Sequence, residues 1–289
     1  MRILLLGATG QLARDLGRRL IRHDVIACSH QELDIEDKQA LADCVAHLRP
    51  ECIINTAAYH RVDDCETHPD RAFAVNAVGA DNLARTASQN NSVLVHFSTD
   101  YVFDGSKSSP YTEADRPNPL SVYGHSKRGG ERLIEQYCEK HFIIRTCGLY
   151  GAAGSASKNG NFVRSILQAA QTRRPLRVVT DQIVTPTSTS DLAEKVSELL
   201  EHNAYGTYHM TNIGECSWFD FAREILRLRG LPVEVEAVST EEFGSAARRP
   251  RYSVLDNSRM RALGIQEFRP WHEALADFLV NAGQMESAA

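Results

Sequence analysis

Tyr123 and Lys127, four residues apart, are the pair in this chain whose types and spacing best suit proton transfer. Four residues make about one helical turn, so both side chains would lie on one face of a helix. A phenol ionises near pH ~10, and a neighbouring ammonium lowers that value, so the pair can pass a proton to a carbonyl oxygen. The alternative is a tyrosine at the edge of a core one turn before a surface lysine.

Hydroxyl side chains follow an apolar run, in the stretch STDYVFDG at residues 98–105. Ser98, Thr99 and Asp100 fall near the end of a predicted strand, where a hydroxyl can hydrogen-bond the carbonyl of a ligand. The alternative is that these residues only terminate the strand, as Ser, Thr and Asp commonly do.

The glycine pattern GATGQLA, at residues 7–13, follows the first predicted strand and opens the first predicted helix. Gly7 and Gly10 permit a tight turn that brings backbone amides and the positive helix end to a pyrophosphate. Ala13 stands where the longer fingerprint has a third glycine. The pattern predicts a dinucleotide site, although any tight strand–helix turn favours glycine.

The end of the second predicted strand bears on the choice of dinucleotide. A carboxylate there binds the ribose 2′-hydroxyl and disfavours NADP. Ser29 and His30 occupy these positions, and Glu32 comes only later in the loop. The chain is therefore predicted to use NADPH, or to accept both NADPH and NADH.

These residues lie in an alternation of apolar runs and amphipathic stretches, which predicts a parallel sheet covered on both faces, a doubly wound α/β fold. The predicted strands cover residues 2–7, 24–29, 52–58, 93–100 and 141–151. The predicted helices cover residues 11–22, 38–49, 71–89, 121–140, 162–171, 188–202, 217–230 and 272–283.

The alternation breaks after about residue 150, where residues 151–161 form a Gly-, Ser- and Ala-rich stretch that is typical of a loop. We expect a dinucleotide-binding domain at residues 1–150. Residues 151–289 are predicted to form a smaller, mostly helical substrate lobe at the carboxyl edge of the sheet, with some segments returning to the first domain.

Composition and charge exclude several classes of function. The net charge of -5 gives no reason to expect nucleic acid or an anionic membrane as a partner. Seven cysteines without a Cys-x-x-Cys pair indicate reduced thiols, and the eleven histidines show no metal-ligand spacing, so no metal site is predicted. The opening apolar run is too short for a signal peptide, and no later stretch is a membrane span, so we expect a cytoplasmic protein.

The chain resembles the extended short-chain dehydrogenase/reductase superfamily and, within it, the dTDP-4-dehydrorhamnose reductase family. The resemblance runs almost from end to end. It is carried by GATGQLARDL, LDIED, INTAAYHRVDDCE, AFAVNAVGADNLA, HFSTDYVFDG, YTEADRPNPLSVYGHSKRGGE, IIRTCGLYG, DQIVTPTSTSDLA, YHMTNIGECSWFDFAREIL and RRPRYSVLDNSRMRALGI.

The resemblance implies a Rossmann-like, two-lobed reductase that transfers hydride from NADPH or NADH to the 4-keto group of dTDP-4-dehydro-6-deoxy-L-mannose, giving dTDP-L-rhamnose for cell-surface polysaccharide. The catalytic residues that it implies are Thr99, Tyr123 and Lys127. Beside Ser29 and His30, the cofactor residues that it implies are Gly7, Gly10, Gln11, Leu12, Asp34, Ile35, Ala57, Ala58, Tyr59 and Lys127. The substrate contacts that it implies are Tyr101, Asn161 and Arg249.

Three departures from the family pattern leave alternatives open. His60 and Arg61 follow Tyr59 near the expected sugar pocket, and Ala13 and Val184 stand where glycine is frequent. A 4-ketoreductase of another nucleotide 6-deoxy sugar is therefore one alternative. A non-catalytic regulatory subunit, like that of methionine adenosyltransferase, is another, and a dehydratase is disfavoured because the position after Asp100 is not Glu.

The resemblance also suggests a homodimer contact or a bound Mg²⁺ ion for Asp15, which the sequence alone indicates to be a surface carboxylate. The expected partner is a nucleotide-sugar substrate.

Overall fold

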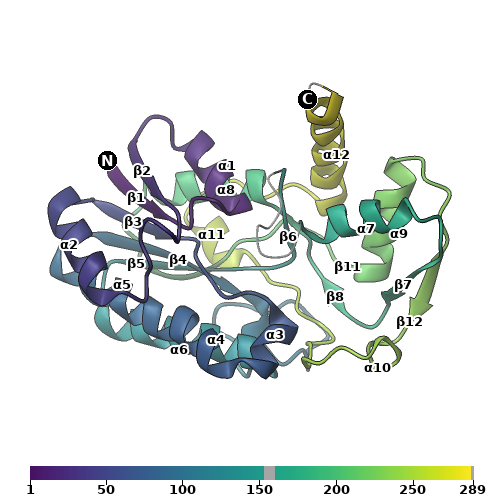
Figure 1. Cartoon of the computed structure of the whole chain (residues 1–289), viewed down its shortest axis with the longest axis horizontal. Coiled ribbons are helices and arrows are strands. Elements are labelled where there is room, and N and C mark those ends of the chain that lie inside the picture. The colour runs from purple at the N-terminus through teal and green to yellow at the C-terminus, as the bar shows by residue number, and fades with distance from the viewer. Residues whose placement is uncertain (153–159, 288–289) are drawn as a thin grey trace.

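The computed structural model describes residues 1–152 and 160–287, and side chains as far as residue 281. The predicted loop at 151–161 therefore lies partly outside the described residues. Two lobes lie side by side: a large sheet with its helices, and a smaller lobe built from the later part of the chain (Figure 1).

The larger lobe is built on a six-stranded parallel sheet with the order β10-β5-β4-β3-β1-β2. The chain order reverses between β1 and β3, and open α/β sheets bind ligands beyond the carboxyl ends of the strands at such a switch point. The strands are β1 (Arg2–Leu6), β2 (Asp24–Cys28), β3 (Cys52–Asn55), β4 (Val93–Thr99), β5 (His141–Thr146) and β10 (Gly206–His209).

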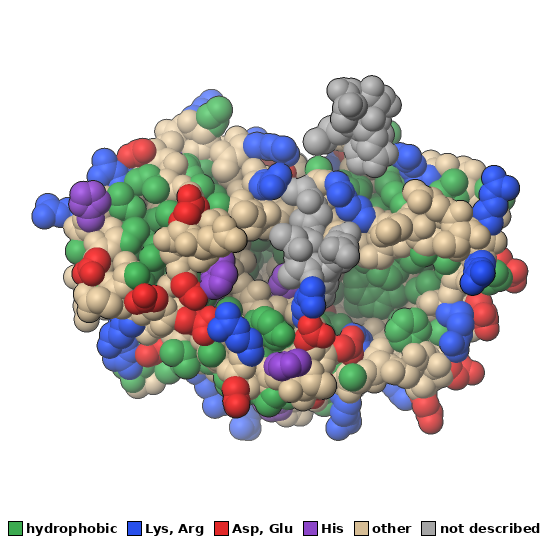
Figure 2. Space-filling view, in the orientation of Figure 1, with side chains coloured by type: hydrophobic (Ala, Val, Ile, Leu, Met, Phe, Trp, Pro, Cys, Tyr) green, Lys and Arg blue, Asp and Glu red, His purple; other side chains and the backbone are tan. Residues whose placement is uncertain are grey.

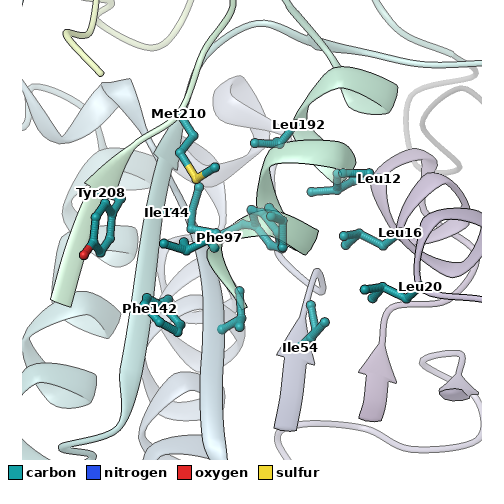
Figure 3. Close-up of a cluster of buried hydrophobic side chains, with 14 of the residues drawn as sticks. Leu12, Leu16, Leu20, Ile54, Phe97, Phe142, Ile144, Leu192, Tyr208 and Met210 are labelled. Carbon is teal, nitrogen blue, oxygen red and sulfur yellow. The ribbon is translucent and has the colours of Figure 1, made fainter. Parts of the chain in front are cut away.

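Helices cover both faces of the sheet because its strands are apolar on both sides. Ile3 and Leu5 of β1 pack in a cluster with α1 (Gln11–Arg19) and α8 (Thr189–Leu199), which lie on one face. Figure 3 shows Leu16 of α1 and Leu192 of α8 in this cluster. Leu4 and Leu6, which alternate with them, face the other way. The helices on that second face are α2 (Lys38–Leu48), α5 (Gly79–Gln89) and α6 (Val122–Tyr137). The predicted doubly wound α/β fold is confirmed.

The helix predicted at residues 71–89 is divided in the structure. A π-helical turn, η1 (Ala74–Val78), separates α4 (Pro69–Phe73) from α5, and α3 (Val62–Thr67) precedes them. After β4 the chain makes the 3₁₀ turn η2 (Asp100–Val102) before it reaches α6. These short elements all lie on the side of the sheet that α6 covers.

The smaller lobe has its own apolar core, which includes Tyr150, Phe221 and Leu275. Its elements, with the short strands and helices that connect it to the sheet, are β6 (Leu149–Tyr150), α7 (Phe162–Ala170), β7 (Leu176–Val179), β8 (Ile183–Val184), β9 (Thr187–Ser188), β11 (Cys216–Ser217), α9 (Trp218–Leu228), β12 (Val235–Val238), α10 (Thr240–Phe243), α11 (Ser258–Ala262) and α12 (Trp271–Ser287).

The division of the chain into residues 1–150 and 151–289 stays a proposal. The later part of the chain supplies β10, which pairs with β5 in the large sheet, and α8, which packs on α1. A boundary by residue number therefore separates segments that share one core.

A glycine sets the distance between α6 and the neighbouring helices. A Cβ atom at Gly130 would overlap the Asn76 carbonyl oxygen and lie 3.1 Å from the Ala80 Cβ. At the adjacent Gly129, the nearest atom would be the Ala77 Cβ at 3.4 Å, an ordinary contact. Of these two glycines, only Gly130 brings the backbone of α6 into close contact with η1.

We predict that Gly130→Ala lowers the free energy of unfolding by about 1–3 kcal/mol because α6 must move away from η1. Gly129→Ala, one residue away, is the matched control. It is expected to leave the free energy of unfolding unchanged or to raise it by up to ~1 kcal/mol, because alanine has the higher helix propensity. Urea unfolding of both variants measures the difference. Equal stabilities would show that the close approach at Gly130 does not constrain the fold.

Candidate active site

Thr99 and Tyr123 lie together beyond the carboxyl end of β4, near the middle of the sheet. Thr99 is the last residue of β4, and its hydroxyl is in hydrogen-bonding contact with the Tyr123 phenol. The same hydroxyl accepts a hydrogen bond from the Tyr101 amide at 3.1 Å and donates one to the Asp100 carboxylate at 2.9 Å. The structure therefore brings these two predicted catalytic residues into one site.

The start of α6 is held so that Tyr123 faces this site. The Ser121 hydroxyl caps the helix by accepting a hydrogen bond from the Gly124 amide at 3.1 Å, and Glu66 of α3 accepts one from the first amide of the helix at 2.8 Å. A Cβ at Gly124 would overlap the Tyr101 carbonyl oxygen. This close approach places the Tyr101 ring edge-on to the Tyr123 ring, with centroids 5.9 Å apart.

Lys127 is buried, which excludes the alternative of a surface lysine. Only 1% of the residue is exposed, and its Nζ atom donates to the Phe97 carbonyl oxygen at 2.6 Å and lies 3.1 Å from His96 Nε2. Burial lowers the pKa of the lysine to about 8, against the opposing effect of the Glu131 carboxylate. Part of the Lys127 population is therefore neutral near physiological pH.

The expectation that Lys127 lowers the pKa of Tyr123 is wrong for the cofactor-free protein. Burial of the phenol raises its pKa, and only the Thr99 hydrogen bond acts in the other direction. The lysine amine instead contacts the Phe97 carbonyl and His96. Tyr123 therefore keeps its proton at neutral pH.

The glycine turn has the geometry that a dinucleotide requires. Gly7 has φ of +79°, and a Cβ there would lie 2.7 Å from Thr56 Oγ1. Gly10 precedes the first turn of α1, whose amides have no side-chain cap and no acidic neighbour. The helix start that carries Gln11 and Leu12 thus has donors available for a pyrophosphate at the switch point of the sheet. These residues fit the predicted cofactor.

A carboxylate does lie at the end of β2, although neither Ser29 nor His30 supplies it. Glu32 folds back, and its Oε2 accepts a hydrogen bond from the Ser29 amide at 2.7 Å. This bond lowers the pKa of Glu32, which is exposed and ionised. Glu32, which was discounted from the sequence as a later residue of the loop, therefore brings a carboxylate back to the end of β2.

The other predicted cofactor residues line the neighbouring strand ends. Asp34 accepts a hydrogen bond from the amide of Glu36 at 3.0 Å, and Ile35 is buried. Residues 57–59, which are Ala57, Ala58 and Tyr59, follow β3 and are partly exposed. Their positions are compatible with the predicted roles, which stay predictions.

The predicted substrate residues make contacts within the protein. The Tyr101 phenol is hydrogen-bonded to Arg249, whose guanidinium pairs with Asp63 of α3 at 2.6 Å. The Asn161 side chain caps α7 and donates to Gln11 Oε1 at 3.1 Å. Arg249 and Asn161 therefore connect segments that are far apart in the chain, and their contacts with substrate stay predictions.

Figure 2 shows a hollow with hydrophobic side chains on the side of the smaller lobe.

Three functional candidates were missed by the sequence argument: Asn55, Asn76 and His96. Each is 1% exposed. Asn76, on η1, accepts from the Tyr59 amide and donates to the Tyr59 carbonyl and to Ser126 of α6, all at 2.9 Å. It thereby connects the loop after β3 to α6, which carries Tyr123 and Lys127. The available signal was a polar residue at a buried position, and π-helical turns often lie at functional sites.

Asp15 is engaged within the chain. Its carboxylate accepts a hydrogen bond from the Thr189 hydroxyl and pairs with Arg18 at 3.2 Å. Within residues 1–152 and 160–287, no cluster of three His, Cys, Asp or Glu side chains is arranged to hold a metal ion. In the same ranges, no helix has both the length and the apolar character needed to cross a membrane.

The family model described as the RmlD substrate binding domain matches residues 1–283. The spore coat polysaccharide biosynthesis protein SpsK of Bacillus subtilis (strain 168) is 41% identical over 280 residues, which are 96% of either chain. The dTDP-4-keto-6-deoxy-D-glucose reductase of Streptomyces niveus is 37% identical over 98% of this chain and 99% of its own.

A similar solved structure is the dTDP-4-dehydrorhamnose reductase of Bacillus anthracis strain Ames in complex with NADP. It superposes with a TM-score of 0.92 and 38% identity, over 97% of this chain and 99% of that chain. The glycine turn, the buried lysine and the tyrosine–threonine contact agree with this similarity. The chain therefore belongs to the dTDP-4-dehydrorhamnose reductase (RmlD) family, a family of NAD(P)-dependent oxidoreductases in the extended short-chain dehydrogenase/reductase superfamily.

Proposed function

We propose that the chain reduces the 4-keto group of dTDP-4-dehydro-6-deoxy-L-mannose to give dTDP-L-rhamnose. The observation that carries the proposal is the contact between the Tyr123 phenol and Thr99, one helical turn from the buried Lys127. Relatives named as dTDP-4-dehydrorhamnose reductases support the choice of sugar nucleotide.

Tyr123 is the proton donor in this proposal. NADPH or NADH, when bound, supplies the hydride that C4 gains. Tyr123 gives its proton to the ketone oxygen, and the raised pKa keeps the phenol in the protonated form that reduction consumes. Thr99 holds the phenol and, by rotating its hydroxyl away from Asp100, donates to the same oxygen.

The cofactor is assigned to the carboxyl edge of the sheet. The amides beside Gly7, Gly10, Gln11 and Leu12 would hold the pyrophosphate, and Asp34 with Ile35 would contact the adenine. Ala57, Ala58 and Tyr59 would line the nicotinamide half, whose ribose Lys127 would contact. A homodimer and a Mg²⁺ ion at Asp15 remain separate predictions.

Another dTDP-4-keto sugar is the second candidate substrate. His60 and Arg61 depart from the family pattern near the expected sugar pocket, and a relative of similar identity is named a dTDP-4-keto-6-deoxy-D-glucose reductase. A non-catalytic regulatory subunit is disfavoured because Thr99, Tyr123 and Lys127 are all present and lie together.

The test of the proposed substrate is a panel of 4-keto-6-deoxy sugars linked to dTDP and to other nucleotides. Consumption of NADPH and NADH is followed by absorbance, and the product stereochemistry is determined by NMR. We expect the highest kcat/KM with dTDP-4-dehydro-6-deoxy-L-mannose and dTDP-L-rhamnose as the product. A higher kcat/KM for another sugar would assign the second candidate, and no turnover of any member would reject the reductase function.

We predict that Tyr123→Phe lowers kcat by about 10²- to 10⁴-fold, the usual contribution of a positioned acid. Cofactor affinity, measured by fluorescence titration, should change little. Tyr137→Phe is the matched control, because it removes a phenol from the other end of α6, where the hydroxyl contacts Gln136 and Arg85. Undiminished turnover in Tyr123→Phe would show that another group supplies the proton.

We predict that Glu32→Gln raises the ratio of kcat/KM for NADPH to that for NADH by about three- to tenfold. The variant removes a negative charge beside the position of the 2′-phosphate, and such a pair of charges in water interacts by about 1 kcal/mol. Glu51→Gln is the control, since Glu51 also accepts a hydrogen bond from a backbone amide, at 2.8 Å, but at the opposite end of the sheet. An unchanged ratio in Glu32→Gln would place the ribose elsewhere.

A further inference from the structure

A chain of buried polar contacts leads from the cofactor-lining loop to the catalytic lysine. The Ala57 amide lies 3.0 Å from Asn55 Oδ1, and Asn55 Nδ2 lies 3.1 Å from His96 Nδ1. His96 Nε2 then lies 3.1 Å from Lys127 Nζ. Asn55 and His96 are directly opposite each other on β3 and β4, and both side chains point to the face that α6 covers.

The direction of these hydrogen bonds is fixed at the first link. A backbone amide only donates, so the atom of Asn55 that faces Ala57 must be the carbonyl oxygen. The NH₂ group of Asn55 therefore faces His96 Nδ1. Because that group only donates, Nδ1 must offer a lone pair.

The same reasoning fixes the proton on the imidazole ring. Burial is the main cause that holds the pKa of His96 well below its usual value, so the ring is neutral and carries one hydrogen. With a lone pair at Nδ1, that hydrogen lies on Nε2 and points at Lys127 Nζ. An ammonium group has no lone pair, whereas a neutral amine has one.

We propose that Asn55 and His96 are positioning residues that favour the neutral amine of Lys127 over the ammonium form in the cofactor-free enzyme. The amine accepts the hydrogen bond from His96 Nε2 and donates one of its own hydrogens to the Phe97 carbonyl at 2.6 Å. An ammonium group at this place would face the His96 N–H with no acceptor. The inference deepens the proposed reductase function and rests on it for the role of Lys127.

The charges around α6 do not override the hydrogen-bond pattern that favours the neutral amine of Lys127. Glu131, one turn after Lys127, favours the ammonium form, but it is paired with Arg145 at 2.9 Å and with Arg128 at 2.8 Å. Other titratable or charged side chains from neighbouring elements lie near the helix start, the phenol, Glu131 or Tyr137. They include Glu66 and Cys65 on α3, Asp100 on η2, Arg145 on β5 and Arg85 on α5.

The neutral amine has a consequence for the proton donor. The smaller the charged fraction of Lys127, the less the lysine favours the phenolate of Tyr123, whose pKa is already raised by burial. The polar chain therefore acts through the lysine to help Tyr123 keep the proton that ketone reduction uses.

The test uses the full-length protein without cofactor or substrate, labelled with ¹⁵N in the histidine rings and with ¹³C at the lysine Cε. NMR distinguishes a ring nitrogen that carries hydrogen from one with a lone pair. The resonances are assigned by their loss in His96→Gln and in Lys127→Met.

At pH 9, where the neutral amine of Lys127 predominates, we expect the Nε2–H form of His96. We expect the amine of Lys127 to titrate at about pH 8 rather than at the ordinary lysine value of 10.5. His96 as the Nδ1–H form or as an imidazolium would overturn the inference. So would a Lys127 that titrates together with the exposed lysines.

Asn55→Asp reverses the direction of the chain of hydrogen bonds. A carboxylate accepts from both the Ala57 amide and His96 Nδ1, so the ring should switch to the Nδ1–H form and the pKa of Lys127 should rise. The matched control is Asn76→Asp, which adds the same charge beside α6 at a side chain that meets Tyr59 and Ser126. A switch of the ring in both variants, or in neither, would contradict the inference.

Reductase activity on the sugar panel is measured with the same wild-type sample. If the His96 ring is in the Nε2–H form but the protein has no reductase activity, only the proposed function is contradicted. Normal activity with the Nδ1–H ring would count against this inference alone. The wild-type measurement stands even if Asn55→Asp does not fold.

Discussion

The burial of one amine at the carboxyl edge of the sheet governs the arrangement of the active site. Lys127 is 1% exposed, so its amine depends on partners from the protein. The Phe97 carbonyl and His96, both on β4, supply these partners. Since they belong to the central sheet, α6 can satisfy the lysine only in one position, and that position brings Tyr123, one turn earlier, to Thr99 at the end of the same strand.

The elements around α6 serve that position. The close approach of Gly130 to Asn76 lets the helix lie against η1, and Gly124 makes the same kind of contact with Tyr101. Asn76 in turn holds the Tyr59 backbone. The loop that would line the cofactor is therefore fixed in position relative to α6, which carries Tyr123. The glycine turn at the start of α1 lies at the switch point between β1 and β3. Tyr123, the proposed proton donor, and the glycine turn, the proposed dinucleotide site, are therefore positioned by one sheet.

The fold was predictable from sequence because the strands are apolar on both faces and the helices have clear periodicity. The predicted strands and long helices recur within a few residues, although η1 interrupts one of them. The site was predictable where motifs carry it, as for Thr99, Tyr123 and Lys127. The buried partners were not predictable, because a lone histidine in an apolar strand gives no sign that His96 meets a lysine from a helix 31 residues later. Glu32 was discounted since its return to Ser29 depends on the loop conformation.

The pH dependence of stability tests most directly whether a buried lysine with a lowered pKa underlies the site. A pKa lowered from 10.5 to about 8 corresponds to roughly 3 kcal/mol. Below pH 8 the lysine is charged in both the folded and the unfolded state, and the folded state carries the full free-energy cost of burying that charge. Between pH 8 and 10.5 only the unfolded chain keeps the proton, so wild-type stability rises relative to Lys127→Met, by an amount on the order of 3 kcal/mol. A difference in the free energy of unfolding between the two proteins that stays constant from pH 7 to 10.5 would contradict this account.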